Sequence, residues 1–113
     1  MADRTILIAD DETAVTAPLE AVLTAEGYDV ACVADGHAAL ERLQQGDVAL
    51  VLTDLQMPGL DGLALLEAIR TRDLLAECIV ITGQASVDTA VEAMRHGAYD
   101  YLETPLTRPK LTR

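Results

Sequence analysis

The chain contains no tryptophan and no phenylalanine, and tyrosine occurs only three times among its 113 residues. Leucine, isoleucine, valine and alanine must therefore fill any core, and because half of the residues are apolar the chain is not disordered. Long apolar runs are also missing, since none approaches the roughly 18–20 residues that a membrane span needs. The first residues do not resemble a signal peptide, so we expect one cytoplasmic domain over residues 1–113.

Positive charge is scarce as well. The sequence has 19 acidic residues against 8 basic ones, a net charge of −11, and Lys110 is its one lysine. Because binding to phosphates requires clustered lysine and arginine, we expect no direct contact with nucleic acid. Most of the acidic side chains are expected to form a solvated surface.

Cysteine and histidine are sparse and give little sign of chemistry. Cys32 and Cys78 each lie in a short apolar segment, which favours two reduced core thiols over a disulfide. His37 and His96 lack the spacing of metal ligands. His96 precedes a glycine, and we expect it to complement the C-terminus of a helix.

Short aliphatic segments alternate with longer segments of helical periodicity. Apolar residues recur at helical spacing around residues 15–23, 39–43, 63–69 and 87–94. Asp61 and Ser86 are placed to cap two of these helices, and glycines at 27, 46 and 97 are placed to end three of them. Pro18 interrupts the first helical pattern, which predicts a later start or a kink. The expected strands are residues 6–9, 30–33, 48–52, 79–81 and 99–102.

This alternation predicts an α/β fold with helices on both faces of a five-stranded parallel sheet. A doubly wound, flavodoxin-like sheet of order 2-1-3-4-5 fits, and its ligand crevice lies between the first and third strands. Asp10 and Asp11 follow the first strand, and Asp54 follows the third. Three carboxylates would then converge, which calls for a divalent cation or strong pKa shifts. Residues 106–113 span only about two helical turns, so a fifth helix looks truncated.

Four motifs in this order resemble the receiver domains of bacterial two-component response regulators, and the resemblance covers essentially the whole chain. They are Asp10-Asp11-Glu12, the segment from Asp54 through Met57-Pro58 to Asp61-Gly62, Ile81-Thr82-Gly83, and residues 97–102 leading into Pro105. Residues 82–85 and 93–100 are most similar to receiver domains attached to enhancer-binding transcription activators. The family implies a histidine kinase as phosphoryl donor and a downstream effector domain as partner.

The resemblance also implies roles for individual residues. Asp54 corresponds to the phosphoacceptor, and Asp11 and Asp54 correspond to direct ligands of Mg²⁺, with Asp10 acting through water. The backbone carbonyl of Gln56 would add another oxygen, and oxygen ligands are what Mg²⁺ prefers. Thr82 corresponds to the switch hydroxyl that bonds a phosphate oxygen, and Tyr101 corresponds to the aromatic residue that moves with it.

Other interpretations of these residues stay open. Asp10 and Asp11, with Glu12, are also placed to cap the first helix, and Tyr101 is equally compatible with simple packing. Receiver domains nearly always carry lysine just before the proline that follows the fifth strand, whereas this chain has Thr104. Threonine is shorter and neutral, so it cannot replace the ammonium group at the acidic cluster.

We therefore expect a phosphoacceptor signalling domain that assists its own phosphorylation and is otherwise not an enzyme. Thr104 favours an alternative, a binding module of the same fold that signals without phosphorylation. A haloacid-type phosphatase also uses an aspartate nucleophile, but it would need a second aspartate where Gln56 stands. That third possibility ranks far below the other two.

Overall fold

Five parallel strands form one sheet in the order β2-β1-β3-β4-β5, as the sequence predicts. A computed structural model of the chain describes residues 5–55, 61–72, 76–82 and 86–103. The strands are β1 (Thr5–Ala9), β2 (Asp29–Val33), β3 (Val48–Thr53), β4 (Glu77–Thr82) and β5 (Asp100–Glu103). β1 and β3 are neighbours although β2 lies between them in sequence, so the strand order reverses at this pair.

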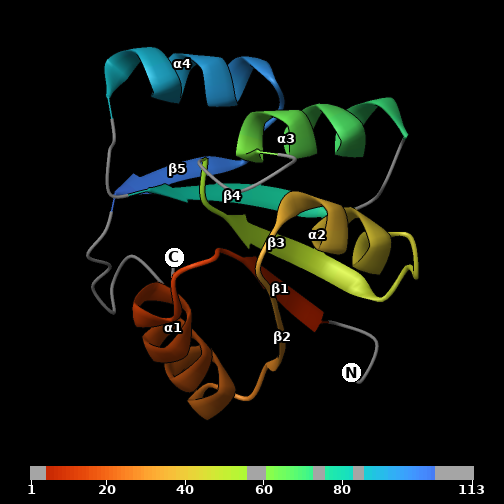
Figure 1. Cartoon of the computed structure of the whole chain (residues 1–113), viewed down its shortest axis with the longest axis vertical. Helices are drawn as coiled ribbons and strands as arrows, with labels where there is room; N and C mark the ends of the chain where they lie inside the picture. The colour runs from red at the N-terminus through yellow and green to blue at the C-terminus, as the bar shows by residue number, and fades with distance from the viewer. Residues whose placement is uncertain (1–4, 56–60, 73–75, 83–85, 104–113) are drawn as a thin grey trace.

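The helices of the described residues cover the two faces of the sheet unequally. They are α1 (Thr13–Ala25), α2 (Gly36–Leu43), α3 (Gly62–Thr71) and α4 (Val87–Arg95). Figure 1 shows α1 on one face of the sheet and α2, α3 and α4 on the other. The predicted fifth helix falls on residues 106–113, which lie outside the described residues.

Side chains of alternating orientation divide the core into two clusters. On β1, Leu7 and Ala9 pack on the side of α2, α3 and α4, whereas Ile6 and Ile8 pack on the side of α1. Neighbouring residues of β3 divide in the same way, with Val51 in the first cluster and Leu52 in the second. The continuous apolar run of β3 is therefore explained by burial on both faces, as expected for a central strand.

The predicted helix signals are confirmed. Asp61 caps α3 through a hydrogen bond from Ala64 N (2.9 Å), and Ser86 caps α4 through one from Thr89 N (3.1 Å). Positive φ angles at Gly27, Gly46 and Gly97 follow the ends of α1, α2 and α4. Glycine adopts this conformation without steric cost, which is why each helix ends there.

The structure corrects two local expectations. α1 starts at Thr13 and includes Pro18, so the expected later start was wrong, whereas the alternative of a kink at Pro18 stays a prediction. Proline cannot donate to the carbonyl of Ala14, but Ala14 is exposed and water can take that place. Cys32 is exposed because β2 is an edge strand, whereas Cys78 on β4 is buried as expected. Across the described ranges, no helix has the length and apolar character needed to cross a membrane.

Candidate functional site

The carboxyl ends of β1 and β3 deliver two acidic residues to the same place. Ala9 and Thr53 are partners in the strand register, so the residues that follow them, Asp10 and Asp54, leave the sheet side by side. Their backbones remain tied to the sheet, because Asp10 N donates to Val33 O and Asp54 N donates to Ala9 O, both at 3.1 Å. A pair of carboxylates therefore lies at the point where the strand order reverses.

A third carboxylate joins this pair. Asp10, Glu12 and Asp54 each offer an oxygen, and these oxygens lie within 4.8 Å of one another. Asp10 is buried, Asp54 is half-buried and Glu12 is exposed, so the group opens from the sheet edge towards solvent. Backbone amides hold two of the side chains: Glu12 N donates to Asp10 Oδ1 (2.9 Å), and Leu55 N donates to Asp54 Oδ1 (2.7 Å).

The structure places Asp11 apart from Asp10 and Asp54, the two aspartates with which it was expected to converge. Asp11 is exposed and is not a member of the three-carboxylate group, whereas Glu12 is. Sequence reasoning missed Glu12 as a possible metal ligand and considered it only as a helix cap. Glu12 does occupy the N-cap position of α1, but its side chain makes no capping hydrogen bond. The direct ligand role of Asp11 stays a prediction.

Burial and like charge act together on Asp10. The pKa of its carboxyl is raised from 3.8 to about 6, with burial as the largest cause and the hydrogen bond from the Glu12 amide opposing it. The negative charges of Asp54, Glu12 and Asp11 contribute smaller parts of the same rise. A divalent cation bound among these groups would offset that repulsion, and an all-oxygen donor set suits Mg²⁺. The residues present therefore fit a magnesium site.

The start of α3 contacts the backbone of Asp54 and Leu55, just after the end of β3. Gly62 N donates to Leu55 O at 2.9 Å, and the Gly62 backbone lies so close that an added Cβ would be 2.3 Å from the Asp54 carbonyl oxygen. Only glycine allows two backbones to approach this closely. On the other side, Thr53 Oγ1 donates to the same carbonyl oxygen at 3.0 Å.

The two predicted switch residues lie on β4 and β5. Thr82 ends β4, the strand next to β3, and is buried with 4% of its surface exposed. Tyr101 is half-buried against the core, and its hydroxyl lies 2.5 Å from Thr89 Oγ1 on α4. Thr89 is also the partner of Ser86 in the capping box that starts α4. Gln56 and Thr104 lie outside the described residues.

The fold is a doubly wound parallel sheet whose strand reversal carries Asp10 and Asp54. The sequence matches the response regulator receiver domain family over residues 6–113. This match covers nearly the whole chain, so the chain belongs to the response regulator receiver domains.

Individual relatives agree with this membership. The transcriptional regulatory protein ZraR of Klebsiella oxytoca is 41% identical over 106 residues, which cover 94% of this chain and 24% of the relative. The crystal structure of the receiver domain of NtrX from Brucella abortus superposes with a TM-score of 0.86 at 34% identity, covering 95% of this chain and 91% of that one. A beryllofluoride-activated NtrC4 receiver domain gives a TM-score of 0.88, also at 34% identity, covering 97% and 90%.

The chain spans about a quarter of the length of the curated relatives that it matches, for example 23% of ZraR from Escherichia coli K12. Family membership therefore concerns the receiver domain. The activity of any longer protein is a separate matter.

Proposed function

We propose that Asp54 accepts a phosphoryl group from a histidine kinase. A carboxylate oxygen of Asp54 attacks the phosphorus of a phosphohistidine, a P–O bond forms as the P–N bond breaks, and the freed imidazole nitrogen leaves. The observation that carries this proposal is the convergence of Asp10, Glu12 and Asp54 within 4.8 Å at the strand reversal. Because Leu55 N holds Asp54 Oδ1, the other carboxylate oxygen is the better placed nucleophile.

Magnesium is the cofactor that this donor set fits. Asp11 and Asp54 would hold it directly and Asp10 through water, with a further oxygen from the Gln56 carbonyl. Glu12, which lies with Asp10 and Asp54, is an additional candidate. When bound, the cation supplies positive charge that stabilises the transferring phosphoryl group. The chain itself contributes the placement of the carboxylates, which the strand register and the amides of Glu12 and Leu55 provide.

Thr82 and Tyr101 would transmit the modification. In this proposal the Thr82 hydroxyl bonds a phosphate oxygen and the Tyr101 ring follows it. Tyr101 contacts Thr89, so its movement would break or strain a bond to the first turn of α4. A local change of charge at Asp54 would thereby alter the surface formed by α4 and β5.

Thr104 predicts a weaker response than a lysine at this position would give. A lost charge-assisted hydrogen bond to phosphate is worth about 1.5–3 kcal/mol, which corresponds to roughly one to two decades in phosphorylation or switching. Thr104→Lys should therefore raise the fraction of phosphorylated domain at a fixed donor concentration. An unchanged phosphorylated fraction would show that the missing ammonium group does not weaken phosphorylation at this site.

The relatives suggest the partners. The matched proteins are several times longer than this chain, and ZraR is a transcriptional regulatory protein. We propose that the receiver controls an effector domain, in the same longer protein or in a separate one. With a net charge of −11, the receiver itself is poorly suited to contact nucleic acid.

Intact-mass measurement with acetyl phosphate and Mg²⁺ tests the proposal directly. We expect the mass of one phosphoryl group to be added to the wild-type chain and to Asp29→Asn, an exposed control at the start of β2. No addition is expected in Asp54→Asn or in the presence of a chelator. The same measurement on Asp11→Asn and on Glu12→Gln shows which of these two acids assists phosphorylation, because the variant that lacks it should gain less mass.

Absence of an adduct in the wild-type chain, with acetyl phosphate and with a phosphorylated kinase, would overturn phosphoryl acceptance. The alternative binding module would then remain. It predicts that a partner binds equally well to the wild type and to Asp54→Ala.

A further inference from the structure

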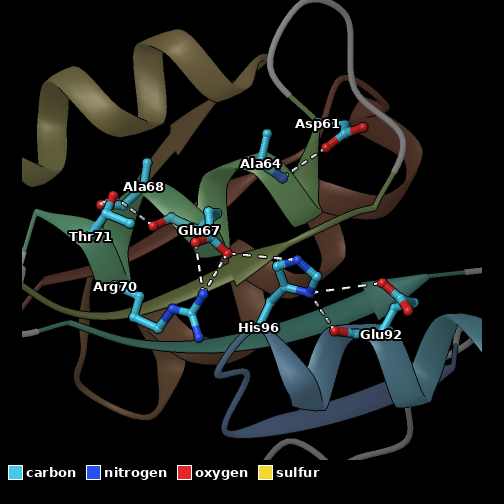
Figure 2. Close-up of polar contacts among 8 residues, drawn as sticks. All are labelled: Asp61, Ala64, Glu67, Ala68, Arg70, Thr71, Glu92 and His96. Carbon is cyan, nitrogen blue, oxygen red and sulfur yellow. Dashed lines mark hydrogen bonds and ion pairs between the residues drawn. The ribbon is translucent and has the colours of Figure 1, made fainter.

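His96 lies at the far end of α4 from the Thr89 contact, as the C-cap residue of that helix. Its side chain is partly exposed and lies between α4 and α3, and Figure 2 shows the ring between Glu67 and Glu92. On its own helix, His96 Nδ1 lies 2.8 Å from the carbonyl oxygen of Glu92. On the other side, His96 Nε2 lies 3.6 Å from Glu67 Oε1 of α3.

The carbonyl contact decides where a neutral ring carries its proton. A carbonyl oxygen only accepts hydrogen bonds, so Nδ1 must be the protonated nitrogen. Nε2 is then a bare acceptor, and it faces a carboxylate oxygen that is also an acceptor. In the neutral state this contact between the helices is therefore not a hydrogen bond. Protonation of the ring places a donor and a positive charge on Nε2, directly towards Glu67.

Hydrogen bonds from Arg70 keep Glu67 in its anionic form. Arg70 Nη2 donates to both carboxylate oxygens of Glu67, at 2.9 and 2.7 Å. This hydrogen bond holds the pKa of Glu67 below its usual value. Glu67 thus stays ionised over the pH range in which histidine side chains change charge.

We propose that His96 and Glu67 form a clasp between α4 and α3 that closes when His96 is protonated and opens when it is neutral. The clasp is favoured at acidic pH and lost at alkaline pH, because only the protonated ring forms an ion pair with Glu67.

The groups around the ring are compatible with this behaviour. Glu92 Oε2 lies 4.0 Å from Nδ1 and also favours the charged ring, whereas Arg70 opposes it. A cavity of about 230 Å³ is lined by His96 and by residues of α3 and β4. Burial raises the pKa of the Cys78 thiol in that lining to about 12, so it adds no charge. The charged and titratable groups of the described residues facing His96 are Glu67, Arg70, Glu77, Cys78 and Glu92.

The clasp acts on the helix that the proposed switch would move, and in this respect it rests on the proposed function. α4 is held at one end by the contact of Thr89 with Tyr101 and at the other by His96. Acidic pH would therefore restrain the C-terminal end of α4 and resist its displacement. The site at Asp54 would keep its chemistry while the response of the output surface became pH-dependent.

A double-mutant cycle in urea unfolding tests the clasp on the unphosphorylated chain. The variants are His96→Gln, Glu67→Gln and the double variant, each measured at pH 5.5 and pH 8. We expect the two sites to couple by roughly two- to fivefold in the unfolding equilibrium constant at pH 5.5, as for a partly exposed ion pair, and not at pH 8. His37→Gln, which removes an exposed histidine of α2, should show no coupling to Glu67 at either pH.

A coupling that is absent at pH 5.5, or equally large at pH 8, would overturn the clasp. Long-range nitrogen–proton NMR at pH 8 gives an independent test, because the neutral ring should carry its proton on Nδ1. A proton on Nε2 would contradict the geometry. Both measurements omit Mg²⁺ and phosphoryl donors, so a failure of phosphoryl acceptance at Asp54 would leave their outcome unchanged.

Discussion

Replacing Gly62 by alanine should damage the phosphoacceptor site through a backbone contact. An alanine Cβ would lie 2.3 Å from the Asp54 carbonyl oxygen and 2.9 Å from Leu55 Cα. Both neighbours are backbone atoms, so no side chain can rotate away. To reach the 3.0 Å that real Cβ atoms keep, α3 and the end of β3 must separate by about 0.7 Å.

The size of the effect follows from this displacement. Overpacking of this kind costs about 1–3 kcal/mol, and the better helix propensity of alanine offsets up to about 1 kcal/mol. With the full offset, we expect a net loss of up to about 2 kcal/mol in the free energy of unfolding. A carboxylate moved by a large part of an ångström should also react at least about tenfold more slowly, because phosphoryl transfer depends on alignment.

Urea unfolding and the rate of mass increase with acetyl phosphate and Mg²⁺ measure the two effects. Gly46→Ala is the matched control: Gly46 has φ +86°, and an added Cβ there meets nothing within 4 Å. Alanine in that conformation should cost a similar amount of stability, about 1–2 kcal/mol, without touching Asp54. If Gly62→Ala reacted as fast as Gly46→Ala, the inferred support of Asp54 by α3 would be refuted.

Three further predictions concern charge, thiols and packing. Because the pKa of Asp10 is raised to about 6, its ionisation destabilises the metal-free domain as the pH rises from about 4 to 6. Asp10→Asn should therefore raise the free energy of unfolding in urea by roughly 1–2 kcal/mol at pH 7 and leave it unchanged near pH 4. The same variant should bind Mg²⁺ more weakly. A thiol reagent at pH 8 should label Cys32 in the native state and Cys78 only on unfolding, since Cys78 is 2% exposed; equal labelling rates would contradict this. Leu65→Ala, at a side chain with 0% exposure between α3 and the sheet, should cost about 2–5 kcal/mol by thermal unfolding, and a smaller loss would show that the core closes around the gap.

Local rules predict much of this fold. Helix starts at Asp61 and Ser86 and helix ends before Gly27, Gly46 and Gly97 follow from side-chain capping and from the φ angle that glycine allows. These are interactions within a few residues, so the sequence contains all of their partners. Strand order was also predictable, because alternating strands and helices leave few topologies and Asp10 and Asp54 suit the reversal point.

The composition of the carboxylate group was less predictable. Asp10 and Asp54 were expected there from their places after β1 and β3, and they do meet. The choice between Asp11 and Glu12 depends on how the chain turns from β1 into α1, and adjacent residues in such a turn point in different directions. A motif of three consecutive acids does not indicate which of them faces β3.

The sequence alone determined the class of fold, the helix ends marked by caps and glycines, and the edge at which the acidic residues gather. Periodicity and capping are encoded locally, and the alternation of strands and helices leaves few possible strand orders. Only the tertiary structure decided that Glu12 joins Asp10 and Asp54, that Gly62 lies against the Asp54 carbonyl, and that His96 faces Glu67. It also decided that Cys32 is exposed while Cys78 is buried. The physical reason is the same in each case: these contacts join residues far apart in sequence or depend on the direction of a side chain, and packing of whole elements sets both.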